Sequence, residues 1–249
     1  MRAQKQQLGV PRDAWFVCLH AREAGYLPEL TYHSYRNVDI MSYLPAVEAI
    51  VARGGWVIRM GDPTMTPLPR MRQVVDYAHS GFKSDWMDVF CLARCRFLLG
   101  DSSGPLVVSF VFGVPCALAN LTPLGDAPYS ARDIWIPKRY RLIREDRDLT
   151  CAEILQSSWR NLHRTQDYEA AGIAWVDNAP EEIQELTEEI LDRLEGRLSY
   201  TTEDERLQQR FKSLLESDSG WRRTARVGRG FLARHRRLLV EEAWNHINV

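Results

Sequence analysis

The sequence predicts an α/β protein built on a Rossmann-like parallel sheet, with helices on both faces and a helical C-terminal extension. Short apolar runs alternate with segments whose apolar residues recur at helical spacing. Glycine or proline separates most of these segments. Such alternation implies parallel strands joined by right-handed crossovers. The 249 residues, 45% hydrophobic and 26% charged, suit one large domain with or without a small appendage.

The first half of the chain supplies five expected strands and three expected helices. Gly54 and Gly55 end the first helix, and Gly113 ends the third. Ser84 is the expected N-cap of the second helix, because its hydroxyl can accept from the first-turn N–H groups. The strands are expected at residues 15–19, 56–60, 74–77, 96–99 and 115–119, and the helices at 42–52, 84–93 and 103–112.

The pattern is weaker after about residue 125. Residues 133–140 read as one more strand, which ends in two basic side chains. Residues 180–195 predict an amphipathic helix with Pro180 at its start and Gly196 after it. Residues 201–216 predict another helix.

These elements divide the chain at about residue 178. Residues 8–178 are the predicted Rossmann-like domain, and 179–249 the helical extension. Residues 221–239 are rich in arginine and hold no acid. Such a segment is usually a solvated face, but it also suits peripheral contact with an anionic membrane surface.

The bulk composition excludes several classes of protein. A net charge of -1 gives no general signal for a nucleic-acid partner. The polar N-terminus lacks the apolar stretch of a secretory signal. Five cysteines without a C-x-x-C pair argue against a disulfide framework. We therefore expect a reduced, cytoplasmic protein.

Polar residues follow three of the expected strands. His20 and Arg22 follow the first, Arg59 and Asp62 lie at the end of the second, and residues 101–104 follow the fourth. Ligands of parallel α/β sheets bind at the carboxyl ends of the strands. The sequence therefore predicts a site at this edge of the sheet.

The stretch Gly100-Asp-Ser-Ser-Gly104 matches the G-x-S-x-G pattern of α/β-hydrolases, with Ser102 as nucleophile. The acid would then be Asp126, Asp133 or Asp177 and the base His163 or His246, none of which has a supporting context. The run Gly100-Asp-Ser-Ser-Gly-Pro-Leu-Val107 also resembles the serine motif of chymotrypsin-like proteases, with Ala78-His79-Ser80 as an echo of the histidine motif. That fold needs far more chain between the two motifs.

A third interpretation is a phosphate-binding turn. Ser102, Ser103 and Gly104 at a helix start offer N–H and O–H donors, and the helix dipole favours an anion. Ser102 acting only as the N-cap of a buried helix explains the residues equally well when they are taken alone. The basic residues at the neighbouring strand ends favour a ligand.

Residues 100–115 resemble the strand–turn–helix that holds the nucleotide-sugar diphosphate in the C-terminal domain of GT-B glycosyltransferases. The longer match is to a family of bacterial glycosyltransferases of surface-polysaccharide loci, and it spans residues 8–240. It rests on Trp15-Phe-Val-Cys-Leu-His-Ala-Arg-Glu-Ala-Gly-Tyr26, Tyr35-Arg-Asn-Val-Asp39, Gly54-Gly-Trp-Val-Ile-Arg-Met-Gly-Asp-Pro63, Asp76-Tyr-Ala-His-Ser80 and Ser84-Asp-Trp-Met-Asp88.

The resemblance implies a glycosyltransferase that takes a nucleotide diphosphate sugar as co-substrate, with no cofactor and no metal. The acceptor would be a glycan or a lipid-linked chain, and the protein would be cytoplasmic or peripheral to the inner membrane. His20 is the candidate base, although a structural histidine is as common at a strand end. The candidate donor-binding residues are Arg22, Arg59, Asp62, Ser102, Ser103 and Gly104; Asp85 and Asp88 are candidate sugar or acceptor contacts, or simple helix-capping residues.

Two departures from that pattern matter. Asp101 stands where a neutral residue is expected, and a carboxylate beside a diphosphate is unfavourable unless it is paired or points away. The chain also holds about half of a GT-B architecture. The alternatives are therefore a nucleotide-sugar-binding module, an inactive half-enzyme, or a serine hydrolase that uses Ser102.

Overall fold

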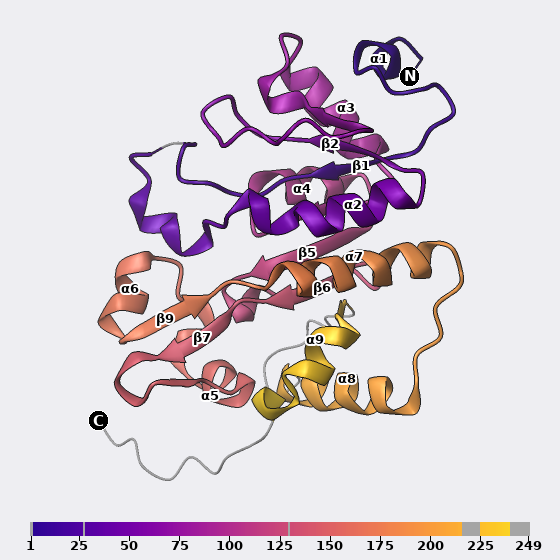
Figure 1. Cartoon of the computed structure of the whole chain (residues 1–249). Helices are drawn as coiled ribbons and strands as arrows, with labels where there is room; N and C mark the ends of the chain where they lie inside the picture. Colours follow the sequence, from indigo (N-terminus) through magenta and orange to yellow (C-terminus); the bar gives the residue numbers. More distant parts are fainter. Residues whose placement is uncertain (1, 27, 129, 216–224, 240–249) are drawn as a thin grey trace.

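A computed structural model of the chain describes residues 2–26, 28–128, 130–215 and 225–239. Its centre is a parallel sheet of seven strands, in the order β10-β6-β5-β4-β1-β2-β3 (Figure 1). The strands are β1 (Phe16–Leu19), β2 (Trp56–Arg59), β3 (Val74–Asp76), β4 (Leu98–Gly100), β5 (Cys116–Leu121), β6 (Ile134–Pro137) and β10 (Arg226–Val227). The predicted α/β fold with a Rossmann-like sheet is confirmed.

The order of the strands reverses at the middle of the sheet. The chain builds β1, β2 and β3 outward to one side, then returns so that β4, β5 and β6 extend from the other side of β1. The register pairs Leu19 with both Arg59 and Leu99. The loops that follow β1, β2 and β4 therefore leave the sheet at one level, and β1 and β4 flank the point where a Rossmann-like sheet opens a crevice.

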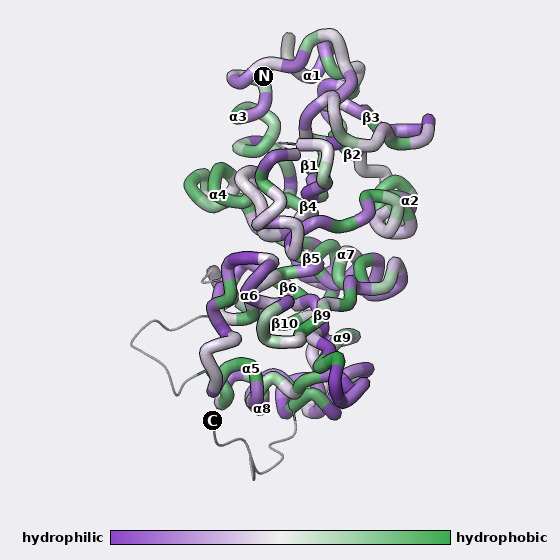
Figure 2. Tube along the Cα trace, turned by 90° about the vertical axis from the view of Figure 1, so that its left-hand side faces the viewer, coloured by the Kyte–Doolittle hydropathy of each residue, from purple (hydrophilic) through white to green (hydrophobic). Residues whose placement is uncertain are grey.

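Helices cover both faces of this sheet. Helices α2 (Leu44–Ala52) and α7 (Pro180–Leu194) lie side by side on one face, and α3 (Asp85–Arg94) and α4 (Gly104–Val111) lie together on the other (Figure 2). The short helix α1 (Arg2–Gln7) precedes the sheet. Each of the three helices predicted in the first half is present with nearly the expected bounds.

The starts of α3 and α4 differ in how they are capped. The Ser84 hydroxyl accepts from the Met87 amide, as expected of an N-cap. Ser103 holds the N-cap position of α4, but its side chain caps no N–H group of that helix. Gly113 ends α4 with φ +65°, a conformation that glycine adopts without strain.

The strand expected over residues 133–140 is two strands in two sheets. Strand β6 is buried on both faces within the parallel sheet, whereas β7 (Arg139–Leu142) alternates exposed and buried positions. Strand β7 pairs antiparallel with β8 (Arg147–Asp148) and β9 (Ile173–Val176) in a separate three-stranded sheet. Helices α5 (Cys151–Leu155) and α6 (Thr165–Ala170) accompany it and were not expected.

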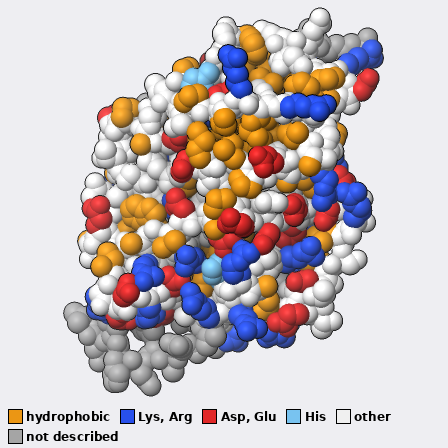
Figure 3. Space-filling view, viewed as in Figure 1, with side chains coloured by type: hydrophobic (Ala, Val, Ile, Leu, Met, Phe, Trp, Pro, Cys, Tyr) orange, Lys and Arg blue, Asp and Glu red, His pale blue; other side chains and the backbone are white. Residues whose placement is uncertain are grey.

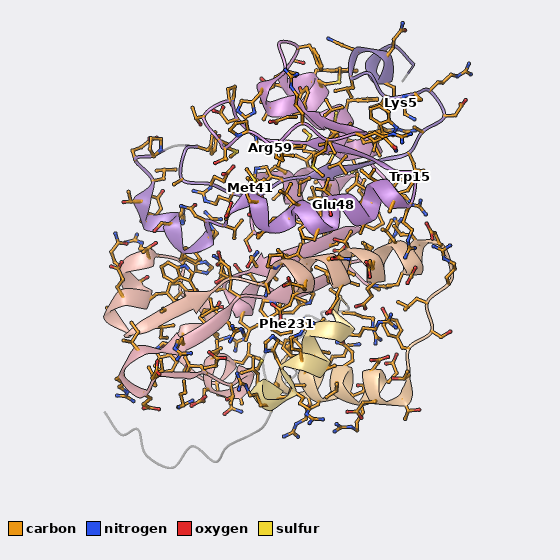
Figure 4. All side chains as sticks on the ribbon, in the orientation of Figure 1. Lys5, Trp15, Met41, Glu48, Arg59 and Phe231 are labelled. Atoms are coloured by element: carbon orange, nitrogen blue, oxygen red, sulfur yellow. The ribbon has the colours of Figure 1, made fainter. Side chains whose placement is uncertain are left out.

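The C-terminal part returns to the main sheet. Helices α7 and α8 (Thr202–Leu215) confirm the two expected helices, and α9 (Arg229–Arg234) follows them. Strand β10, which lies between α8 and α9 in the chain, pairs with β6 and extends the parallel sheet at its edge. Phe231 of α9 is buried (Figure 4). The division at residue 178 stays a prediction.

Three arginines of the C-terminal segment, Arg226, Arg234 and Arg237, have carboxylate partners among the described residues. Arg226 pairs with Glu205, and Arg234 with Glu185. Figure 3 shows basic and acidic side chains interspersed over this part of the molecule. Residues 221–224 of the predicted membrane-contact segment lie outside the described residues, so that contact stays a prediction.

Candidate functional site

A cavity of about 390 Å³ opens at the carboxyl edge of the sheet, where the strand order reverses. The loops after β1, β2 and β4 and the first turns of α3 and α4 form its walls. It is lined by His20, Arg22, Tyr26, Met60, Gly61, Asp62, Met65, Lys83, Asp85, Asp88, Leu92, Ser103, Gly104 and Pro105.

His20 is held by one ring nitrogen. Its Nδ1 lies 2.9 Å from the Ser103 hydroxyl oxygen and 3.7 Å from Oδ1 of Asp101. The side chain is almost wholly buried, yet it reaches the wall of the cavity. Because Nδ1 is engaged, Nε2 is the nitrogen that a bound molecule can use.

Asp101 is paired within the protein. Its carboxylate is buried and accepts a hydrogen bond of 2.6 Å from the Arg22 backbone amide. The Ser103 amide donates to its carbonyl oxygen. Asp101 thus ties the loop after β1 to the turn after β4, and it is absent from the cavity wall. The unfavourable carboxylate noted in the sequence is therefore used to position Arg22.

Arg22 is the cation of the cavity that lacks an acidic side-chain partner within bonding distance. No ion pair joins it to any of the described residues, and its buried Nε has no hydrogen-bond partner. Burial and the nearby charge of Arg36 lower the pKa of Arg22. An uncompensated, half-buried guanidinium of this kind is suited to an anionic ligand.

Arg36 does not line the cavity, but its charge acts on Arg22, and sequence reasoning missed it. It ends a short 3-10 helix, Thr31–Arg36, and its guanidinium donates to the Ser102 carbonyl oxygen at 3.3 Å. Its Nε is also buried without a partner. Arg36 lies in one of the segments that carried the family resemblance, but no spacing in the chain relates it to residues 101–104.

Arg59 has a different environment. Its side chain is fully buried at the end of β2 (Figure 4) and donates to Glu23 at 2.8 Å and to the Thr66 carbonyl oxygen at 3.1 Å. It does not line the cavity. Asp62 does, and hydrogen bonds from the Thr64 amide and hydroxyl lower the pKa of Asp62.

The wall formed by α3 is acidic. Asp85 and Asp88 both face the cavity, and Lys83 donates to Oδ2 of Asp88 at 2.7 Å. The other oxygen of Asp88 is buried and has no hydrogen-bond partner. The cavity therefore has a basic side at Arg22 and an acceptor-rich side suited to hydroxyl groups.

The structure brings most of the predicted site residues together but leaves out two. His20, Arg22, Asp62, Asp85, Asp88, Ser103 and Gly104 line the cavity, whereas Arg59 and Ser102 do not. The Ser102 hydroxyl instead accepts from the Thr122 amide at 3.3 Å. Ser103 therefore contributes the hydroxyl at this turn. Because that hydroxyl is hydrogen-bonded to His20, the first N–H groups of α4 lack a side-chain cap.

The geometry required of a hydrolase is not found at these serines. Ser103 and Asp101 both approach Nδ1 of His20, whereas a catalytic triad needs the serine and the acid on opposite ring nitrogens. His163 lies 3.9 Å from Asp126 in an exposed pair, with no hydrogen bond to Ser102. His246 lies outside the described residues.

Comparisons with protein-family models, with curated proteins and with solved structures found no match for this chain. Within the described ranges, no group of three or more His, Cys, Asp or Glu residues is arranged to hold a metal ion. Nor does any helix in the part of the chain described here have the length and apolarity needed to cross a membrane.

Proposed function

We propose that the cavity binds the diphosphate of a nucleotide sugar and that the protein transfers the sugar to a hydroxyl group of a glycan or lipid-linked acceptor. The observation that carries this proposal is the guanidinium of Arg22, which faces the cavity at the strand-order reversal without an acidic side-chain partner. An anion is the ligand that such a group favours.

The surroundings of Arg22 support a ligand with more than one negative charge. Arg36 adds a second guanidinium close enough to lower the pKa of Arg22. The start of α4, with Gly104 in the cavity wall, offers N–H groups without a side-chain cap. These donors would stabilise the charge that develops on the departing diphosphate, which is an electrostatic contribution to catalysis.

His20 is the proposed general base. In this scheme Nε2 takes the proton of the acceptor hydroxyl as its oxygen attacks the anomeric carbon, and the bond from that carbon to the diphosphate oxygen breaks. Ser103 fixes the ring through Nδ1, and the buried carboxylate of Asp101 lies 3.7 Å from the same nitrogen. Asp62, Asp85 and Asp88 are the proposed partners of sugar hydroxyls on the opposite wall.

Release of nucleoside diphosphate from a panel of nucleotide sugars tests this proposal, with wild type, His20→Ala and Arg22→Met compared. Release by the wild type alone supports transferase chemistry at this cavity. Tight binding by the wild type without release, with glycan and lipid-linked acceptors present, identifies a binding module instead. Equal release by all three proteins would exclude both residues from the mechanism.

A further inference from the structure

The outer face of α3 and α4 is the largest cluster of exposed apolar side chains in the described structure. Six of the eleven large hydrophobic residues that are exposed lie on these two adjoining helices or at their ends, so the exposure is concentrated rather than scattered. Figure 2 shows α4 as a largely hydrophobic coil at the outer edge of the molecule. The six are Trp86, Val89, Val107, Phe110, Val111 and Phe112.

Helix α4 has the reverse of the polarity expected of a solvent-facing helix. Ser109 is fully buried against α3 and donates to the Leu92 carbonyl oxygen at 3.5 Å. Val107 and Val111 point outward and are 63% and 72% exposed. Burying the Ser109 hydroxyl while exposing the two valines costs free energy in an isolated monomer. This face is therefore suited to contact with another molecule.

Helix α3 contributes a rigid aromatic surface to the same face. Trp86, 60% exposed, stacks on Phe90 with ring centroids 5.5 Å apart and planes inclined by 10°. Stacked aromatic side chains have few rotamers to lose when a partner binds. Large aromatic residues with little charge between them are typical of the centre of a protein–protein interface.

We propose that a second copy of this chain covers the α3/α4 face in a two-fold dimer. The six exposed side chains offer on the order of 600 Å² of apolar surface, close to the roughly 800 Å² that each partner buries in a standard stable interface. Polar residues around the face would supply the remainder as a rim. A two-fold axis is the symmetry that lets one patch cover its own copy.

The charges of α3 favour a second copy over a membrane surface. Asp85 and Asp88 occupy its first turn and line the cavity, and Asp85 is also exposed beside Trp86. The same two acids lie next to Trp86, where an anionic lipid surface would repel them. Trp86 adjoins Asp85 of the cavity wall, and Val107 lies two residues beyond Pro105 of that wall, so the partner would lie beside the cavity rim.

Sedimentation analysis across a dilution series tests the dimer with wild type, Val111→Glu and a matched control, Ile143→Glu. Ile143 is 61% exposed but lies in the loop after β7, away from the patch. We expect wild type and Ile143→Glu at twice the mass of one chain. We expect Val111→Glu at the mass of one chain, with unchanged circular dichroism because the substituted side chain is exposed.

A wild type that stays at the mass of one chain throughout the series would overturn the proposal. So would a folded Val111→Glu variant that keeps the doubled mass. Co-sedimentation of a single-chain wild type with vesicles of phosphatidylethanolamine and phosphatidylglycerol, lost in Val111→Glu, would assign the patch to a lipid surface instead. A thiol cross-link in Val107→Cys would support the dimer, because all five native cysteines are buried.

Discussion

Arg22 follows β1 and Arg59 ends the neighbouring strand β2, and both are expected from the sequence to bind the donor. The two arginines differ in their partners. Arg59 forms an ion pair with Glu23, whereas among the described residues no carboxylate lies within bonding distance of the Arg22 guanidinium. The side chain that neutralises Arg59 comes from the loop after β1. The folded position of Glu23 in this loop therefore determines that Arg22, and not Arg59, is available to a ligand.

Arg59→Met is expected to destabilise the fold. Removing the guanidinium leaves Glu23 as a buried carboxylate without its partner and takes one of its partners from the half-buried Asp76, which costs about 3–5 kcal/mol. Urea denaturation measures the loss. Arg72→Met, at an exposed position, is the control and is expected to change the free energy of unfolding little. Equal stabilities of the two variants would show that Arg59 is not needed to balance these acids.

Ser103→Ala is expected to lower turnover, and Ser102→Ala is the matched control. Losing the Ser103 hydroxyl frees Nδ1 of His20, so we expect turnover to fall roughly tenfold through a misoriented base. Ser102→Ala removes only a contact to the Thr122 amide and should leave turnover nearly unchanged. A fluorophosphonate probe should label neither serine. Labelling of Ser102 in folded protein would restore the hydrolase interpretation.

At the scale of single elements, strands and helices with strong local signals could be predicted. The bounds of α3, α4 and α7 follow from Ser84, Gly113 and Pro180, which act locally. The segment 133–140 could not be divided correctly. Its two halves join different sheets around the buried Lys138, whose ammonium donates to the Asn37 carbonyl oxygen and pairs with Asp177. Those partners are distant in sequence, so the apolar pattern alone reads as one strand.

Asp133, which precedes β6, is expected to make stability depend on pH. Burial raises the pKa of Asp133 to about 6, while its side chain accepts from the Cys116 amide. The folded state therefore holds a proton that the unfolded chain releases near pH 4, and stability should fall as pH rises from about 4 to about 6. The loss approaches about 3 kcal/mol and then levels off.

Comparison with Asp133→Asn isolates this contribution. The amide oxygen of asparagine can still accept from the Cys116 amide, but the side chain does not titrate. Urea denaturation of both proteins at pH 4 and pH 7 should show a larger decrease for wild type. Parallel pH profiles for the two proteins would mean that Asp133 does not titrate in this range.

At the scale of the whole molecule, local pattern predicted the fold class but not the order of the strands. The reversal between β1 and β4 brings His20 beside Ser103, and nothing in the spacing of those residues requires it. The pairing of β10 at the edge of the sheet could not be predicted either, because a strand of two residues is too short to show a hydrophobic pattern. The sequence could predict a site formed by polar residues at strand ends, but which of those residues line the cavity depends on the strand order.

A chain that ends at residue 178 is expected not to fold on its own. Helix α7 covers α2 with Ile183, Leu186, Ile190 and Leu191, all buried, and β10 covers the edge of β6. Without them β5 and β6 lose the helix that covers them on that face of the sheet. Cooperative thermal unfolding, followed by circular dichroism, is expected for the full chain only. A cooperative transition in the fragment would instead support an independent domain at residues 8–178.

The proposed transfer reaction requires that the cavity at the strand-order reversal bind a diphosphate at Arg22. Calorimetric titration of nucleoside diphosphates into wild type and Arg22→Met tests it most directly. We expect one diphosphate site per chain, weakened roughly 10- to 100-fold in Arg22→Met through loss of charge-assisted hydrogen bonds, while the melting temperature changes little. Equal affinity in the two proteins, or no binding of any nucleoside diphosphate by folded wild type, would contradict the account.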